Sequence, residues 1–162
     1  MLNVFEMPLV RGAQYAVAHG SDRAPDLAEK QPRTAHRALY LLDLPGYGYA
    51  RASQAERRAF RLLITHALAR PRLSGVLWLL DIRRDPSPDD RTMHELFAGR
   101  ETRVLAALTK SDKLPRGQRE RRARELRAAL ALDADQLIVT SALAGEGVPE
   151  LSEAVAGLVA AQ

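Results

Sequence analysis

The chain has 162 residues, of which 46% are hydrophobic and 27% charged, with no cysteine and a formal net charge of +4 at pH 7. This suits one globular domain spanning residues 1–162, and the lack of cysteine excludes disulfides and thiolate metal sites. No apolar run reaches the length of a transmembrane helix and residues 1–12 lack a secretory-signal pattern, so a cytoplasmic protein without membrane contact is predicted. The positive net charge favours a polyanionic partner. Alternatively, it reflects the high arginine content that a GC-rich genome encodes.

Short apolar runs alternate with amphipathic stretches along the chain. A strand is predicted at 2–7, and four nearly continuous apolar runs predict strands covered on both faces, as in a parallel sheet, at 38–43, 75–81, 103–109 and 136–140. Helical patterns occupy 53–70, 87–99, 116–131 and 148–160. The first helix opens with Ser53 and Glu56 at the spacing of a capping box. The alternation predicts an α/β layered fold with right-handed crossovers. Residues 8–37, rich in proline and turn residues, are predicted to form a long surface loop between the first two strands.

Three short polar motifs follow predicted strands, where ligands bind in open α/β sheets. The first is Asp43-Leu44-Pro45-Gly46. A carboxylate at a strand end can hold hydrated Mg²⁺, and the later glycine lets a backbone N–H approach a phosphate without a Cβ in the way. The alternative is a strand-ending turn, because D-x-x-G is common.

The second motif is Thr109-Lys110-Ser111-Asp112. The Asp112 carboxylate can accept two parallel hydrogen bonds from the N1–H and exocyclic N2–H₂ of guanine, whereas adenine presents the wrong pattern on that edge. The aliphatic stem of Lys110 can lie along the face of the base. A polar loop with a helix cap is the alternative interpretation.

The third motif is Thr140-Ser141-Ala142, where the backbone N–H of the small residue Ala142 can donate to guanine O6. This tripeptide is the weakest signal by itself. The order and spacing of the three motifs, each at the end of a predicted parallel strand, make coincidence improbable and together predict a guanine-nucleotide site.

On these motifs the chain resembles the EngB/YsxC/YihA-type ribosome-assembly GTPases, a branch of the TrmE–Era class. The stretches DLPGYGYA, TKSDKL and SALAGEG carry the resemblance, which runs from Leu2 to the C-terminus outside 8–37. It implies a three-layer α/β/α fold with a mostly parallel sheet, binding of GTP or GDP with Mg²⁺, and slow GTP hydrolysis. It also implies large-subunit biogenesis and cell division as processes, with the large ribosomal subunit or ribosomal RNA as partner.

The resemblance also assigns roles to the first motif. Asp43 would reach Mg²⁺ through water, the Gly46 amide would meet the γ-phosphate, and residues 47–50 would begin the switch II segment. Many GTPases place a glutamine after this glycine to orient the attacking water. Tyr47 stands there instead, so either the water is positioned by another group or the tyrosines face a partner.

The chain departs from the family in its N-terminal part. The loop G-x-x-x-x-G-K-[ST], whose amides and lysine cradle phosphates, occurs nowhere in the sequence, and the switch-I threonine has no counterpart. The first strand, the phosphate loop and the first helix are therefore predicted to be missing, through a misplaced start or a truncation. ALYLL and VLWLL would then flank a gap in the sheet. Whether the 162 residues act as an enzyme is left open.

Six arginines lie in the predicted helix between residues 116 and 127, at 116, 119, 121, 122, 124 and 127. They predict either contact with RNA phosphates or, as the favoured alternative, a solvated face with i,i+4 pairs such as Glu120–Arg124. Two functions follow: a GTP-binding, slowly hydrolysing switch when full length, or a degenerate non-catalytic module that binds ribosome or RNA.

Overall fold

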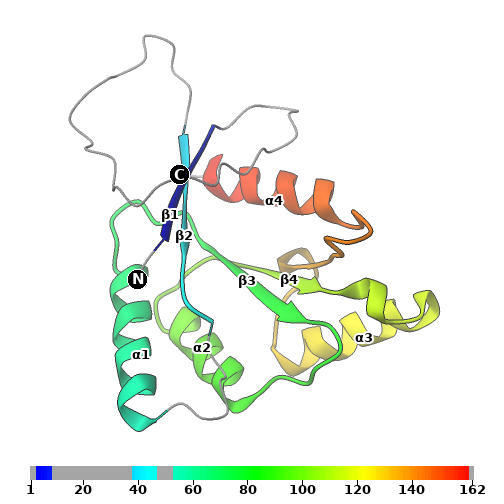
Figure 1. Cartoon of the computed structure of the whole chain (residues 1–162), viewed down its shortest axis with the longest axis horizontal. Coiled ribbons are helices and arrows are strands. Elements are labelled where there is room, and N and C mark those ends of the chain that lie inside the picture. Colours follow the sequence, from blue (N-terminus) through cyan, green and yellow to red (C-terminus); the bar gives the residue numbers. More distant parts are fainter. Residues whose placement is uncertain (1–2, 9–37, 47–52, 161–162) are drawn as a thin grey trace. The chain divides into compact units, whose positions relative to one another are not determined.

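The structure, a computed structural model, describes residues 3–8, 38–46 and 53–160. Contacts divide the chain, drawn in Figure 1, into two compact units, Met1–Gly46 and Tyr47–Gln162. Most of the predicted 8–37 loop and the predicted switch segment 47–50 lie outside the described residues, whereas Pro8 is the last residue of a strand.

The described residues of the first unit form two strands, β1 (Asn3–Pro8) and β2 (Ala38–Asp43), close to their predicted positions. They pair in antiparallel fashion, with Asn3 opposite Asp43 at one end and Pro8 opposite Ala38 at the other. The expectation of parallel pairing for β2 was therefore wrong for its described partner. A continuous apolar run indicates that both faces of a strand are covered, but it does not specify the direction of the neighbouring strand.

The second unit is built on a parallel sheet with the strand order β3-β4-β5. The strands are β3 (Val76–Asp81), β4 (Val104–Thr109) and β5 (Leu137–Val139). Residues 104–108 of the central strand β4 are all buried, as a near-continuous apolar run predicts. On β3 only Trp78 is buried, and Leu79 is 62% exposed. Among the described residues β3 pairs on one side only.

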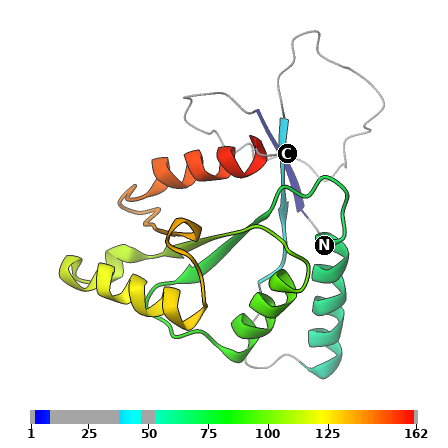
Figure 2. The same cartoon turned by 180° about the vertical axis from the view of Figure 1, so that it is seen from behind.

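The described part of this unit also has four α-helices: α1 (Gln54–Leu68), α2 (Pro88–Ala98), α3 (Arg116–Ala129) and α4 (Val148–Ala160). Both α1 and α2 begin with capping boxes, Ser53 with Glu56 and Ser87 with Asp90, so the predicted box at Ser53 is confirmed. Helix α4 lies on the opposite side of the sheet from α2 and α3 (Figures 1 and 2). The predicted α/β layering is thus confirmed, and no helix among the described residues is long and apolar enough to cross a membrane.

Apolar side chains fix α2 and α3 against the sheet. Trp78 of β3 stacks on His94 and meets Phe97 edge-on, and both partners belong to α2. Ile82, the residue after β3, forms a buried cluster with Leu108 of β4 and Leu126 of α3. Because successive side chains of a strand point to opposite faces, Leu79 lies on the face of β3 away from Trp78 and its α2 partners.

Candidate functional site

The carboxyl ends of the three parallel strands lie at one edge of the sheet. Asp81, the last residue of β3, is in register with Thr109, the last residue of β4, and Thr109 Oγ1 donates to the Leu80 carbonyl at 3.0 Å. The Thr140 amide, just after β5, donates to the Leu108 carbonyl at 2.8 Å. Sheet pairing therefore brings the predicted motifs at 109–112 and 140–142 together.

The loop that follows β4 leaves the strand through a left-handed residue. Lys110 has φ 63° and ψ 34°, and a short 3₁₀ turn, Ser111–Lys113, follows it. Ser111 is fully buried, and its amide donates to the Thr140 carbonyl at 3.1 Å. Such a conformation is uncommon for a residue with a side chain, and here it turns the chain sharply out of the sheet.

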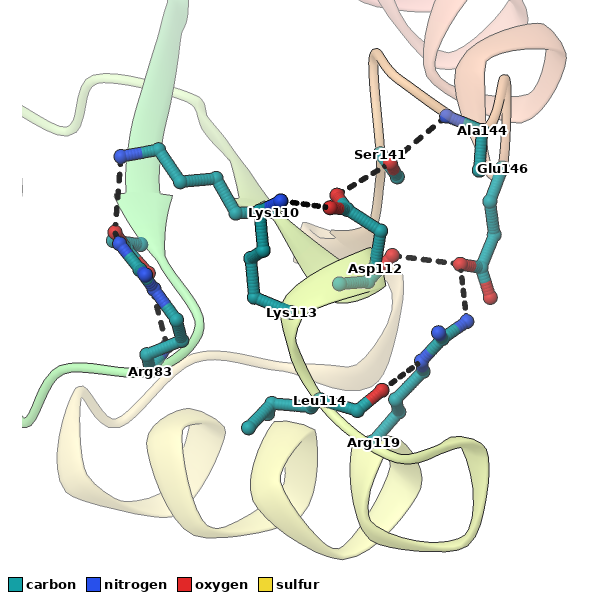
Figure 3. Close-up of polar contacts among 11 residues, drawn as sticks. Arg83, Lys110, Asp112, Lys113, Leu114, Arg119, Ser141, Ala144 and Glu146 are labelled. Atoms are coloured by element: carbon teal, nitrogen blue, oxygen red, sulfur yellow. Dashed lines mark hydrogen bonds and ion pairs between the residues drawn. The ribbon is translucent and has the colours of Figure 1, made fainter.

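Asp112 is held by the loop that follows β5. Ser141 Oγ donates to Asp112 Oδ1 at 2.7 Å and accepts from the Ala144 amide at 3.1 Å, as Figure 3 shows. The hydrogen bond from Ser141 is the largest cause that holds the pKa of Asp112 below its usual value, and nearby Lys113 acts in the same direction. Asp112 is therefore an ionised, oriented acceptor at neutral pH.

An ionised carboxylate in this setting suits two adjacent N–H donors, such as the N1–H and N2–H₂ of guanine. Lys113 Nζ lies 3.2 Å from Asp112 Oδ2, the oxygen that Ser141 leaves free. The Lys113 side chain is 53% exposed, so a ligand can displace this ion pair at small cost.

A second cluster surrounds Asp81. Its carboxylate accepts three hydrogen bonds from Arg83, from the backbone amide at 3.1 Å, Nε at 2.9 Å and Nη2 at 2.7 Å, and a fourth from Lys110 Nζ at 3.0 Å. The bond from Arg83 is the main cause that holds the pKa of Asp81 well below its usual range, with Lys110 adding to it. The pair anchors the Lys110 side chain, which extends away from Asp112 (Figure 3).

A third cluster, which we call the Glu146 clasp, consists of Glu146, Ser111 and Arg119. Glu146 Oε2 accepts from Ser111 Oγ and from Arg119 Nη1, each at 2.6 Å. Arg119 Nε also donates to the Leu114 carbonyl at 3.0 Å. The hydrogen bond from Ser111, followed by Arg119, lowers the pKa of Glu146. The clasp ties the start of α3 to the loops after β4 and β5.

Sequence reasoning missed the roles of Asp81, Arg83 and Glu146. Asp81 ends an apolar run, as Asp43 does, and Glu146 lies within SALAGEG, so both had a signal in the sequence. Arg83 is two residues from Asp81, but Lys110 is 29 residues from Asp81 and Ser111 is 35 residues from Glu146. Local spacing does not identify such pairs.

The first predicted motif belongs to the other unit, so its part in the site stays a prediction. Asp43 and Gly46 are exposed, and a Cβ built on Gly46 meets no atom within 4 Å. No group of three or more metal-ligating side chains occurs among the residues that the structure describes. Ala142 is exposed, and its predicted hydrogen bond to guanine O6 likewise stays a prediction.

The arginines of α3 are largely committed to ion pairs. Arg122 Nε donates to the Ile82 carbonyl at 3.0 Å and Nη2 to Asp85 at 2.7 Å, so this side chain supports the fold, as Arg119 does in the Glu146 clasp. The predicted pair Glu120–Arg124 is present at 2.7 Å. These contacts favour the ion-paired helix face over RNA contact.

The chain is similar to several curated GTP-binding proteins, although no protein-family model matches it. It is 46% identical over 121 residues to the probable GTP-binding protein EngB of Gemmatimonas aurantiaca, covering 74% of this chain and 59% of that protein. It is 39% identical over 115 residues to the probable GTP-binding protein EngB of Geobacillus thermodenitrificans (70% and 59%), and 37% identical over 125 residues to that of Geobacillus kaustophilus (76% and 64%). The chain thus spans about three fifths of the length of these relatives.

A solved structure shares the fold. The crystal structure of a probable GTP-binding protein engB matches with a TM-score of 0.64, covering 76% of this chain and 78% of that chain. At 14% identity this match is a likeness of fold alone.

Proposed function

The likenesses in sequence and in fold support an EngB-type GTPase, and from that premise we propose that this chain recognises the base of a guanine nucleotide. The observation that carries the proposal is the hydrogen bond from Ser141 to Asp112 at 2.7 Å. It joins two predicted motifs and leaves an ionised carboxylate to accept the two N–H donors of guanine. Adenine offers no such pair of donors to Asp112.

The proposal extends to Lys110 as the residue that flanks the base. Its amino group is anchored on Asp81, which leaves the aliphatic stem between the end of β3 and the loop that holds Asp112. A methylene stem of this kind covers a flat ring while its charged end stays paired.

We further propose that Asp43 is the protein's partner for a nucleotide-bound Mg²⁺, through water, and that the Gly46 amide meets the γ-phosphate. Mg²⁺ characteristically takes only one or two protein carboxylates and fills its other positions with phosphate oxygens and water. One exposed aspartate at a strand end fits that chemistry, as does a glycine whose surroundings leave room for a phosphate.

The finer functional roles rest on the resemblance of DLPGYGYA, TKSDKL and SALAGEG to motifs of the EngB/YsxC/YihA-type GTPases. They are slow GTP hydrolysis, cytoplasmic action in large-subunit biogenesis and cell division, and binding to the large ribosomal subunit. Hydrolysis needs a phosphate-cradling loop, and the 162 residues contain no G-x-x-x-x-G-K-[ST]. We therefore attribute base recognition to this chain and expect weak binding of GDP, on the order of millimolar, without measurable hydrolysis.

The test is a nuclear magnetic resonance titration of the isotope-labelled chain with GDP and, separately, with ADP. We expect the amide signals of Asp112 and Ser141 to shift with GDP at millimolar concentration and to stay in place with ADP. Equal shifts with both nucleotides would mean that only the phosphates bind, and the proposal would then be wrong. Binding of ribosomal RNA with no response to GDP would favour the degenerate module instead.

A further inference from the structure

The Glu146 clasp joins three segments through a single carboxylate oxygen. Ser111 comes from the loop after β4, Arg119 from the first turns of α3, and Glu146 from the loop after β5. The backbone carbonyl of Glu146 also accepts from the Ser141 amide at 2.9 Å. Glu146 is therefore bonded through its side chain to Ser111 and Arg119, contacts that Figure 3 shows, and through its main chain to Ser141.

The clasp acts on the residue directly before Asp112. Ser111 is fully buried, and the 2.6 Å hydrogen bond to Glu146 fixes its hydroxyl. On the other side, Ser141 holds the Asp112 carboxylate itself. Two hydrogen bonds therefore hold the short turn that carries Asp112. Ser111 donates to the ion-paired carboxylate of Glu146, and Asp112 accepts from the hydroxyl of Ser141.

We propose that Glu146 is a positioning residue for guanine recognition, which with Arg119 sets the direction in which Asp112 presents its oxygens. The inference rests on the proposed function, because it concerns the same site. Charge-assisted hydrogen bonds are short and directional, so losing them lets the 111–113 turn rotate away from the geometry that two parallel bonds require. An Asp112 that is rotated out of place keeps its charge and can still accept one hydrogen bond from the base, but it no longer aligns with both donors of guanine at once.

The decisive comparison uses GDP and inosine diphosphate, which lacks the exocyclic 2-amino group of guanine. In the parent chain Asp112 bonds two donors of GDP and one of inosine diphosphate, so GDP binds more tightly. Glu146→Ala should lower the affinity for GDP much more than that for inosine diphosphate, and the preference should fall by about tenfold. Glu150→Ala, an exposed acidic residue in the first turn of α4, is the matched control and should leave the preference unchanged.

A second variant, Glu146→Gln, allows the same comparison if Glu146→Ala folds poorly. Glu146→Gln retains an oxygen for the Ser111 hydroxyl and loses the charge that pairs with Arg119, so it should show an intermediate preference. Hydrogen exchange at the Ser111 amide should be faster in both Glu146 variants than in Glu150→Ala, with no nucleotide present.

The outcomes separate the two ideas. If the parent chain does not distinguish GDP from ADP, the proposed function is wrong and the positioning role is wrong with it. If the parent distinguishes them and Glu146→Ala weakens GDP and inosine diphosphate equally, the clasp is merely structural and this inference alone is overturned. An unchanged preference in both Glu146 variants would overturn it as well.

Discussion

Two glycines in the loop after β5 share a left-handed backbone and differ in their surroundings. Gly145 has φ +70° and Gly147 has φ +68°. A Cβ built on Gly145 meets no atom within 4 Å, whereas one built on Gly147 overlaps the carbonyl oxygen of Val139 and lies 3.3 Å from Thr140 Cγ2. Gly145→Ala therefore measures the loss of stability caused by the left-handed backbone alone, whereas Gly147→Ala adds the loss caused by steric overlap.

The surroundings of the two glycines predict that Gly147→Ala destabilises the protein more than Gly145→Ala does. Alanine in the left-handed region costs about 1–2 kcal/mol, and that is the whole expected loss for Gly145→Ala. Gly147→Ala carries the same cost and must also displace the end of β5, and overpacking of this kind adds about 1–3 kcal/mol. We expect Gly147→Ala to lower the free energy of unfolding by roughly 2–5 kcal/mol in total.

The assay is urea unfolding followed by tryptophan fluorescence. Trp78 is the only tryptophan in the sequence, is 4% exposed and contacts two rings of α2, so its emission reports the unit that contains both glycines. Equal destabilisation by the two substitutions, or a larger loss for Gly145→Ala, would refute the reasoning from steric overlap.

Three further outcomes are expected. Asp112→Asn should weaken GDP by about 2 kcal/mol and favour xanthosine diphosphate, whose 2-oxo group accepts from an amide; titration showing equal GDP binding by variant and parent would contradict the assignment. Replacing the exposed Arg116, Arg121 and Arg124 by Glu should leave the salt dependence of binding to large ribosomal subunits unchanged, and a shallower slope would instead establish RNA contact. Because the pKa of Asp81 is lowered on folding from 3.8, its contribution to stability is present above about pH 4 and is lost as pH falls through the lowered value. Asp81→Asn should therefore flatten the acid dependence of the urea midpoint, and an unaltered dependence would exclude this role for Asp81.

The positions of the helices and strands could be predicted because local signals determine them. Continuous apolar runs marked β3 and β4, and a capping box at Ser53 marked the start of α1. The meeting of Asp112 and Ser141 was also predictable in outline, because neighbouring parallel strands end at the same edge of a sheet.

What could not be predicted depends on tertiary geometry. The direction of β2 pairing, the inward orientation of Arg119 and the attachment of Lys110 to Asp81 are set by which surfaces face one another after folding. Sequence spacing finds an arginine that pairs with a carboxylate one turn away on the same helix, and it does not find one that binds a carboxylate in a distant loop. Arg124 and Arg119 illustrate the two cases on a single helix.

Among the residues that the structure describes, one edge of β3 has no partner strand and Leu79 is exposed, so the pairing of this edge depends on the concentration of any strand that can reach it. A strand tethered to the same polypeptide faces this edge at an effective concentration on the order of millimolar, far above that of a separate molecule in a dilute solution. If a strand of the same polypeptide can reach this edge, it pairs with β3 at any working concentration of protein. Without one, occupation of the edge rises with the amount of protein, so dilution decides whether β3 stays single or pairs with another chain.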